Sequence, residues 1–195
     1  MQKLAQVVCY AQDSALIGVF ILRGIKNYNL LQNLVEEKEE QLQLSKIYLI
    51  AGRKARSNTA YISAIQYLNS GIRMIESFGE QCWNSNREVC FDLYYERALC
   101  QWMAGNFDAS VKQFHNLLNR CETVLEKTAI YKMLVELHTA KTELNKAVES
   151  GLNGLGLLGI EMSATPSDEE VADNYDLLWQ DINNRSIASL NDLPE

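Results

Sequence analysis

Helix-breaking residues are scarce in this chain, which has two prolines and ten glycines among 195 residues. Proline removes a backbone N–H donor and clashes with the preceding helical turn, so its scarcity leaves long stretches free to be helical. Hydrophobic residues make up 47% of the sequence, enough to bury a substantial core without disulfides or metals. The composition therefore favours an all-α fold.

Sequence motifs for phosphate transfer are also missing. The chain contains no G-x-x-x-x-G-K-[ST] loop, no H-R-D sequence and no D-F-G sequence. The first of these cradles nucleotide phosphates, and the other two supply a base and hold magnesium in kinases. We therefore expect this chain to be no kinase by itself, to have no other enzymatic activity and to need no cofactor.

Cysteine is present, but not at the spacing of a metal site. The five cysteines are Cys9, Cys82, Cys90, Cys100 and Cys121, an odd number without a C-x-x-C pair. Structural zinc sites usually draw on such closely spaced pairs. We therefore expect no metal site, and reduced thiols that serve as small core residues on the helices of a cytoplasmic protein.

Positive charge and long apolar runs are in short supply as well. The net charge is −7, whereas a broad nucleic-acid footprint requires a basic surface. The apolar run Ala15–Leu22 is too short for a bilayer, which needs about 20 apolar residues. We expect it to form a buried helical segment. The alternatives are a membrane or targeting element or, in an excised fragment, a segment that packs on a preceding domain.

What the chain does contain is an internal repeat marked by three tyrosines, Tyr48, Tyr94 and Tyr131. Small or β-branched residues follow them at +4, namely Gly52, Ala98 and Val135. Bulky residues follow at +13, just after a turn, and Ala or Ser at +16: Tyr61, Phe107 and Leu144, then Ala64, Ser110 and Ala147. Each unit is predicted to be a helix, a tight turn and a second helix that crosses the first closely. Such units stack because none can bury its apolar face alone, and most such arrays bind proteins.

Periodicity and turn residues place the elements of the first hairpin. Its first helix is predicted to end near Arg56, its turn to lie at 57–59 and its return helix to cover 61–75. The inward residues of the return helix are expected to be Ile65, Leu68, Ile72 and Ile75. Residues 76–86 are predicted to be a loop, and Ser85 with Glu88 to form the capping box of the next helix.

Further along the chain, the second hairpin is predicted to turn at Gly105–Asn106. The third is predicted to begin with a capping box of Thr123 and Glu126, and a last helix with one of Ser167 and Glu170. We interpret that last helix as a terminal cap. The expected organisation is N-terminal helices or a linker from a preceding domain over 1–43, three helix-turn-helix repeats over 44–162, a capping helix over 163–183 and a tail over 184–195.

Several runs are distinctive beyond the repeat. In the first hairpin they are Ala51-Gly52-Arg53-Lys54-Ala55-Arg56, Ala60-Tyr61, Ala64, Tyr67-Leu68 and Gly71. After it they are Trp83, Gly105-Asn106-Phe107 and Leu157-Leu158-Gly159-Ile160. Over about residues 44–172 they resemble the tetratricopeptide-like region of very large signalling multi-kinases. In that family a Ser/Thr-kinase-like domain and a signal-transduction ATPase domain precede the helical region, and a GAF domain and a histidine kinase follow it.

The resemblance implies an α-solenoid and a non-catalytic, regulatory segment of a cytoplasmic two-component signal-transduction kinase. It implies that the partners are a protein, a peptide or flanking domains of the same chain, and that the stack transmits or restrains motion between an ATPase module and a downstream kinase. Neither His115 nor His138 has the flanking sequence of a phospho-accepting histidine. We expect both to be partly exposed helical residues.

In tetratricopeptide hairpins the first helix of each pair lines a concave groove. With the three tyrosines as equivalent positions, the inward positions are Lys46, Leu49, Arg53 and Arg56, then Asp92, Tyr95, Leu99 and Trp102, then Ala129, Lys132, Glu136 and Thr139. The candidate binding residues among these are Lys46, Arg53, Arg56, Tyr95, Leu99, Trp102, Lys132 and Glu136. Such a groove is basic at one end and aromatic in the middle, which suits an acidic-hydrophobic peptide or a neighbouring domain. Alternatively, Leu99 and Trp102 pack on the next hairpin, and Arg53 and Arg56 are solvated.

Two other functions remain open. A passive spacer between kinase domains would bind no ligand. A nucleic-acid-binding repeat would use as phosphate contacts Arg53, Lys54, Arg56, Arg23 and Lys26. The acidic stretch Glu36–Glu40 and the net charge disfavour it, so we expect no nucleic-acid partner and no membrane surface.

Overall fold

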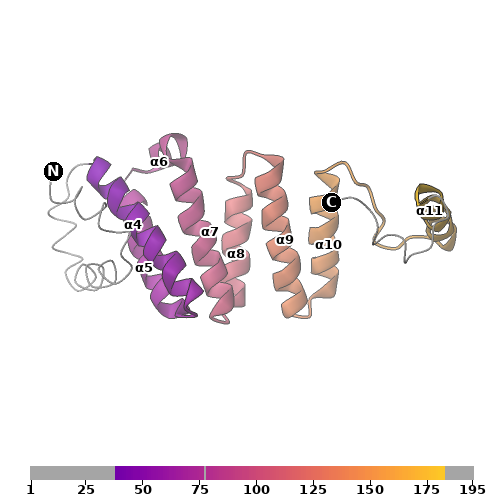
Figure 1. Ribbon diagram of the computed structural model, residues 1–195, viewed down its shortest axis with the longest axis horizontal. Coiled ribbons are helices and arrows are strands. Elements are labelled where there is room, and N and C mark those ends of the chain that lie inside the picture. Colours follow the sequence, from indigo (N-terminus) through magenta and orange to yellow (C-terminus); the bar gives the residue numbers. More distant parts are fainter. Residues whose placement is uncertain (1–37, 77, 183–195) are drawn as a thin grey trace.

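The structure, a computed structural model, describes residues 38–76 and 78–182 (Figure 1). The apolar run Ala15–Leu22, Cys9 and the predicted tail lie outside the described residues. Every regular element within them is an α-helix: α4 (Lys38–Ser57), α5 (Tyr61–Glu76), α6 (Glu80–Ser85), α7 (Arg87–Met103), α8 (Phe107–Leu118), α9 (Val124–Ala140), α10 (Leu144–Gly156) and α11 (Asp168–Asp181). The all-α prediction is confirmed.

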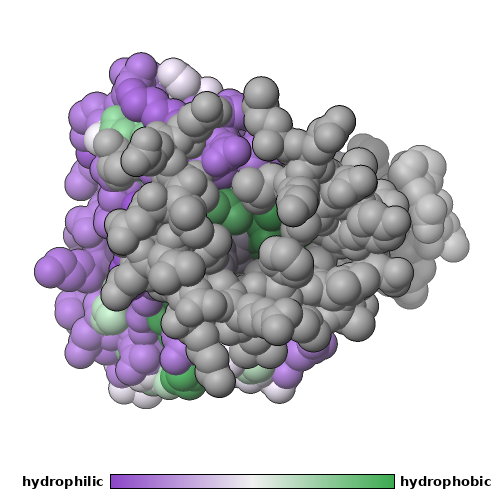
Figure 2. Space-filling model, turned by 90° about the vertical axis from the view of Figure 1, so that its left-hand side faces the viewer, coloured by the Kyte–Doolittle hydropathy of each residue, from purple (hydrophilic) through white to green (hydrophobic). Residues whose placement is uncertain are grey.

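Most helices pack on their neighbours in sequence. Three hairpins are formed by α4 with α5, α7 with α8 and α9 with α10, and they follow one another along the long axis of the molecule in Figure 1. Contacts of α5 with α7 and of α8 with α9 join each hairpin to the next. In Figure 2, which views the α4–α5 end, most of the coloured surface is hydrophilic, and some hydrophobic surface is visible. Buried clusters that join residues of neighbouring hairpins show that their apolar faces meet.

The three hairpin turns share one backbone geometry. Thr59, Gly105 and Thr142 stand eleven residues after the repeat tyrosines, and their φ angles are 58°, 83° and 59°. The next N–H in each turn donates to the carbonyl five residues back at 2.8–2.9 Å: Ala60 to Ala55, Asn106 to Gln101 and Glu143 to His138. A left-handed residue with this hydrogen bond closes the preceding helix. The turns are confirmed at the predicted places, although two of them put a threonine where a β-branched residue is rarely found.

Small residues lie where paired helices cross, as the repeat predicts. Ser110 Oγ donates to the Ala98 carbonyl at 2.8 Å and so joins α8 to α7. On α4, a Cβ added to Gly52 would lie 2.6 Å from two side-chain carbons of Leu68, which is fully buried on α5. On α10, a Cβ added to Gly154 would lie 3.1 Å from Cβ of Tyr131. At these crossings, a side chain of one helix therefore packs directly against the backbone of the other helix.

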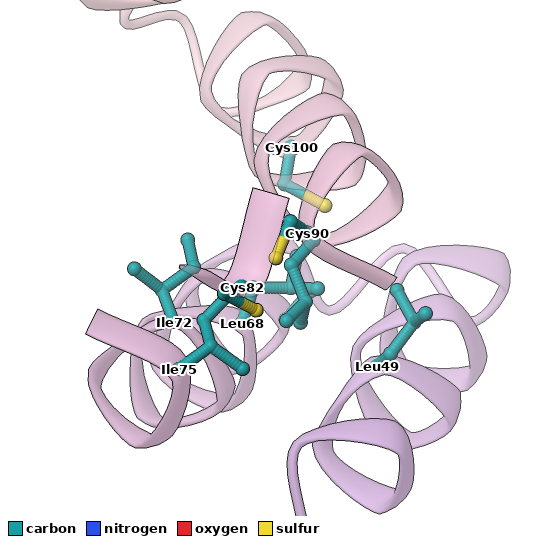
Figure 3. Packing of buried hydrophobic residues seen from close by; sticks show 9 residues of the cluster. Leu49, Leu68, Ile72, Ile75, Cys82, Cys90 and Cys100 are labelled. Carbon is teal, nitrogen blue, oxygen red and sulfur yellow. The ribbon is translucent and has the colours of Figure 1, made fainter. Parts of the chain in front are cut away.

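The core consists of successive hydrophobic clusters along the row. One joins Leu68, Ile72 and Ile75 of α5 to Leu49 of α4 and to buried cysteines, as Figure 3 shows. The predicted inward positions of α5 are thus confirmed for Leu68, Ile72 and Ile75, while Ile65 packs at the edge of the cluster. A second cluster joins Phe114 and Leu117 of α8 to Ile130, Leu134 and Leu137 of α9.

The loop predicted over 76–86 is wrong in its second half, because α6 occupies Glu80–Ser85. Cys82 is buried and Trp83 packs on the first cluster, so tertiary contacts support a helix in a polar-looking segment. The Ser85–Glu88 capping box is wrong too, since α7 follows Asn86 without a side-chain cap bond. The other two predicted capping boxes are both present. The boundary placed between 43 and 44 falls inside α4.

The last helix forms, but it does not cover the end of the row. In Figure 1, α11 stands apart from α10, and residues 157–167 connect the two. Val171, Tyr175, Leu177 and Leu178 are 54–58% exposed. The interpretation of this helix as a terminal cap therefore differs from the structure, because the apolar side chains that a cap would bury lie open.

Arg87, the first residue of α7, ties the second hairpin to the third. Its guanidinium donates to the two carboxylate oxygens of Glu126 at 2.5 and 2.9 Å and to the Arg120 carbonyl at 2.6 Å. Glu126 also accepts the N–H groups of Thr123 and Glu122. Partial burial acts to raise the pKa of Glu126, but the bonds from Arg87 and from these N–H groups outweigh it and lower the pKa to about 2.

We predict that Gly52→Ala destabilises the protein. The new methyl group would overlap the fully buried Leu68, which costs about 1–3 kcal/mol and exceeds the gain of about 1 kcal/mol in helix propensity. Chemical denaturation would measure the change in unfolding free energy. Gly156→Ala is the matched control, because a Cβ there meets nothing within 4 Å and should be neutral or stabilising. Equal effects of the two substitutions would contradict the close crossing.

We also predict that part of the acid sensitivity of the fold comes from Glu126. Its pKa lies below the ordinary value of 4.5, so its carboxylate stabilises the fold fully above about pH 4.5 and progressively less as pH falls toward 2. Glu126→Gln should therefore lower stability by about 1–2 kcal/mol at pH 7 and flatten the decline between pH 4.5 and 2. Denaturation curves over this pH range would test it. Glu122→Gln, whose side chain is 74% exposed beside the same arginine, should change little.

Candidate protein-binding face

The predicted binding residues lie on the first helix of each hairpin. We call the side of α4, α7 and α9 that carries them the first-helix face; its candidate residues are Lys46, Arg53, Arg56, Tyr95, Leu99, Trp102, Lys132 and Glu136. On it, α4 contacts α7 directly. Leu49, which was predicted to point inward with them, is buried in the core instead, with 6% exposure. The eight candidates fall into three groups with different surroundings.

The two arginines of α4 share one carboxylate of α7. Arg53 Nε donates to Glu96 at 2.8 Å, and Arg56 Nε donates to the other oxygen of Glu96 at 2.7 Å. Arg53 also pairs with Asp92 at 2.8 Å. Burial acts to lower the pKa of Arg53, but the hydrogen bond that it donates to Glu96 and the nearby Asp92 raise the pKa overall. The cluster holds two positive and two negative charges, so the two arginines of the predicted basic end are neutralised.

Glu96 is the residue of this cluster that was not predicted from the sequence. Its side chain is 7% exposed, whereas those of Arg53 and Arg56 are 45% and 36% exposed. A signal was present, because Asp92 and Glu96 stand one helical turn apart on α7, as do Arg53 and Arg56 on α4. Pairing the two helices would have matched these charges. Lys46 is exposed one to two turns before the cluster on α4.

The aromatic middle of the face is partly core. Tyr95 stacks on Phe91 with ring centroids 5.9 Å apart and meets the edge of Phe114 at 5.6 Å. Leu99 and Trp102 are half-buried and pack against the second cluster. The alternative that Leu99 and Trp102 pack on the next hairpin is therefore correct in part. The rest of each side chain lies on the surface.

The third group is the most exposed. Lys132 and Glu136 stand one turn apart on α9, with Nζ and the carboxylate oxygen 4.0 Å apart. Their side chains are 74% and 41% exposed. Such an exposed pair contributes little to stability, about 0–1 kcal/mol. Lys132 or Glu136 can therefore give up this pairing and bind a ligand at little cost.

A pocket lies between α5, α6 and α7. It measures about 280 Å³ and is lined by Ile75, Glu76, Gly79, Glu80, Cys82, Trp83, Cys90 and Tyr94. Trp83 stacks on Tyr94 at 5.7 Å, and Arg120 lies over Trp83 at 5.3 Å while it donates to Glu80 at 2.5 and 2.7 Å. Of the two carboxylates that line the pocket, that of Glu80 is therefore already paired with Arg120.

Four cysteines are buried thiols, as predicted for core residues: Cys82, Cys90, Cys100 and Cys121. Burial raises the pKa of Cys90, with a contribution from the hydrogen bond to Cys82. Burial also raises the pKa of Cys100 and of Cys121 to about 11. Within 38–76 and 78–182, no group of three His, Cys, Asp or Glu side chains is arranged to hold a metal ion.

The two histidines differ. His115 is exposed on α8, with Nδ1 2.9 Å from the Val111 carbonyl. His138 was predicted to be partly exposed and is buried, at 5%, with Nδ1 2.8 Å from Glu143. The prediction for His138 is wrong because the turn after α9 brings Glu143 back over the ring. Neighbouring Lys141 and Lys146 also pair with Glu143.

A G-x-G-x-x-G spacing of the dinucleotide-binding type, which was expected to be absent, occurs at Gly154, Gly156 and Gly159. In dinucleotide-binding folds that spacing opens a helix after a strand, and the helix N-terminus faces the pyrophosphate. Here it closes α10, with Gly154 buried beneath Tyr131 and Gly159 in a left-handed turn. The local backbone therefore presents carbonyls, not N–H groups, and does not fit that ligand.

Comparison with known proteins gives one informative match. No family model and no solved structure matches the chain. A hybrid signal transduction histidine kinase, kinase G of Dictyostelium discoideum, is 23% identical over 176 residues, which covers 87% of this chain. The chain spans 5% of that protein's length. None of the described helices is long and apolar enough to cross a membrane.

We predict that Glu96→Gln loosens the first hairpin from the second. The substitution keeps the shape of the side chain but removes the charge that both arginines approach, and hydrogen bonds to charged groups are worth about 1.5–3 kcal/mol. Because the arginines are one-third to one-half exposed, we expect a loss near the lower end, about 1–2 kcal/mol, in urea denaturation. Glu149→Gln, at an exposed position of α10, is the control. A loss no larger than the control's would rule out the cluster as a tie between hairpins.

By sequence, then, the chain is related to a hybrid histidine kinase of signal transduction, of whose length it matches a small part.

Proposed function

We propose that this chain is a tetratricopeptide-like, non-catalytic helical-repeat module that binds protein and regulates a cytoplasmic two-component signalling kinase from within. The relation to a hybrid signal transduction histidine kinase carries the signalling part of this proposal. The three equivalent hairpin turns support the repeat architecture. The regulatory partner is either a peptide or a flanking domain of the same chain.

The face that would receive the partner is the first-helix face, in its α7–α9 part. There Trp102 offers a half-buried ring, and Lys132 offers an exposed ammonium group that only a weak pair with Glu136 engages. Tryptophan is over-represented among residues that dominate binding energy, and a charge on the same face fixes orientation. We therefore propose a partner with an apolar anchor for Trp102 and a carboxylate for Lys132.

The α4 end of the face favours a structural role. Arg53 and Arg56 already hold Glu96 and Asp92, so an acidic ligand would have to replace a pair that is partly desolvated. The same pairing leaves little charge for nucleic-acid phosphates. This end therefore supports the alternative of a passive spacer, which the experiment below separates from binding.

We predict that Lys132→Glu and Trp102→Ala each weaken partner binding. In a pull-down from extracts of the source cells with the 195-residue chain as bait, partners read by mass spectrometry should fall about tenfold with either variant, which corresponds to about 1.4 kcal/mol. Charge reversal should act through the partner's carboxylate, and truncation through the lost apolar contact.

Lys112→Glu on α8 is the matched control for charge reversal, since Lys112 is exposed on a second helix. Circular dichroism and thermal unfolding of all variants would show whether the fold is intact, which matters most for Trp102→Ala. Capture that is unchanged in all three variants would favour the passive spacer and end the assignment of this face.

A further inference from the structure

The C-terminal end of the row leaves an apolar helix face uncovered. On α10, Leu144 and Val148 are 62% and 49% exposed, and Leu152 and Leu155 are partly exposed on later turns. These positions are four, four and three residues apart, so they form one stripe along the helix. In the rest of the row such a face on a second helix is covered, since α5 packs on α7 and α8 packs on α9.

The face of α8 that α9 covers shows which side chains would be needed to cover the corresponding face of α10. Counting 37 residues on from α8, which is the interval from Tyr94 to Tyr131, places Val148 at the position of Val111 and Leu155 at that of Leu118. Val111 and Leu118 pack against the cluster that α8 shares with α9. Gly151 takes the position of Phe114, the largest buried side chain of that cluster. The exposed face of α10 is therefore apolar but lacks a bulky side chain at this position, so a partner must bring the bulk itself.

The helix α11 is constructed like α9. Both start with a complete capping box, at Thr123 with Glu126 and at Ser167 with Glu170. The interval of 44 residues places Tyr175 at the position of Tyr131, and Leu177 and Leu178 at those of Met133 and Leu134. Met133 and Leu134 are 8% and 1% exposed on α9, whereas Leu177 and Leu178 are both 55% exposed. The α9 side chains that fill its interface with α8 therefore have bulky, exposed counterparts on α11.

The geometry points to a docking site on α10 for α11 of the same chain, in the register that α9 uses on α8. In the structure α11 stands apart, so the docked arrangement is a second state of the C-terminal end. In that register Leu178 would pack beside Gly151, between Val148 and Leu155. This inference goes beyond the proposed binding role, since it concerns a different surface and an internal partner.

Charge and tether length both allow this docking. At 100° per residue, the acidic side chains of Glu169, Asp173 and Asp176 lie opposite the stripe of Val171, Tyr175 and Leu178, so they stay in solvent when the stripe is covered. The connection of residues 157–167 can span about 35 Å, whereas packed helices lie about 8–10 Å apart. A short tether of this kind also gives an effective concentration of about millimolar, which favours the internal partner over a second copy.

Hydrogen–deuterium exchange on the full chain tests the docking with three variants. Leu178→Glu alters α11, Val148→Glu alters only the face of α10, and Ile62→Glu is the control at an exposed apolar position of α5. We expect the amides of residues 168–181 to exchange about tenfold faster in the first two variants than in the unchanged chain and in Ile62→Glu. Val148→Glu leaves α11 itself intact, so it keeps the test valid where Leu178→Glu weakens the isolated helix.

Equal exchange of α11 in all four proteins would overturn the inference, because an undocked helix gains no protection from α10. Protection that rises with protein concentration, together with a dimer in sedimentation, would overturn it as well, since α11 would then dock on a second copy. Concentration-independent protection that both variants remove would establish the docked state within one chain.

Discussion

The spacing of the whole row depends on the close contact between the two helices of each hairpin. Leu68 rests on the bare backbone of Gly52, Tyr131 lies over Gly154, and Ser110 bonds directly to a carbonyl of α7. Interiors pack densely, so a contact set at this distance fixes where every neighbouring side chain can sit. The left-handed residue eleven positions after each tyrosine then ends the first helix. The second helix of the pair can therefore start where its apolar side chains meet those of the next hairpin, as in the second cluster.

The sequence predicted those features that depend on neighbours within a hairpin. Helical periodicity, small residues at crossings and two of the three capping boxes all act over a few residues, and the structure contains them. Features that depend on distant contacts were missed. The helix α6 is held by burial of Cys82 and packing of Trp83, the burial of His138 depends on how the next turn folds, and the placement of α11 depends on whether two separate apolar faces meet.

The candidate face shows the same division. Its residues are on the expected helices, because the tyrosine interval aligns the first helices of the three hairpins. Its charge was not predictable in the same way, since Glu96 and Arg53 are 43 residues apart and meet only when α4 contacts α7. In this acidic chain Arg53, Arg56, Arg87 and Arg120 are all paired with carboxylates from another helix or turn. These arginines tie hairpins and their connections together, and an acidic ligand at any of them would compete with those ties.

The buried thiols allow local opening of the fold to be followed without an added label. Burial raises the pKa of Cys100 and of Cys121 to about 11, which keeps both as thiols at pH 7, and both side chains are buried away from a reagent. Alkylation must then wait for a local opening, and the order in which the cysteines react records which part of the row opens first. Cys100 reports on the cluster of the first two hairpins and Cys121 on that of the second and third, so two rates from one unlabelled protein would map where the array yields.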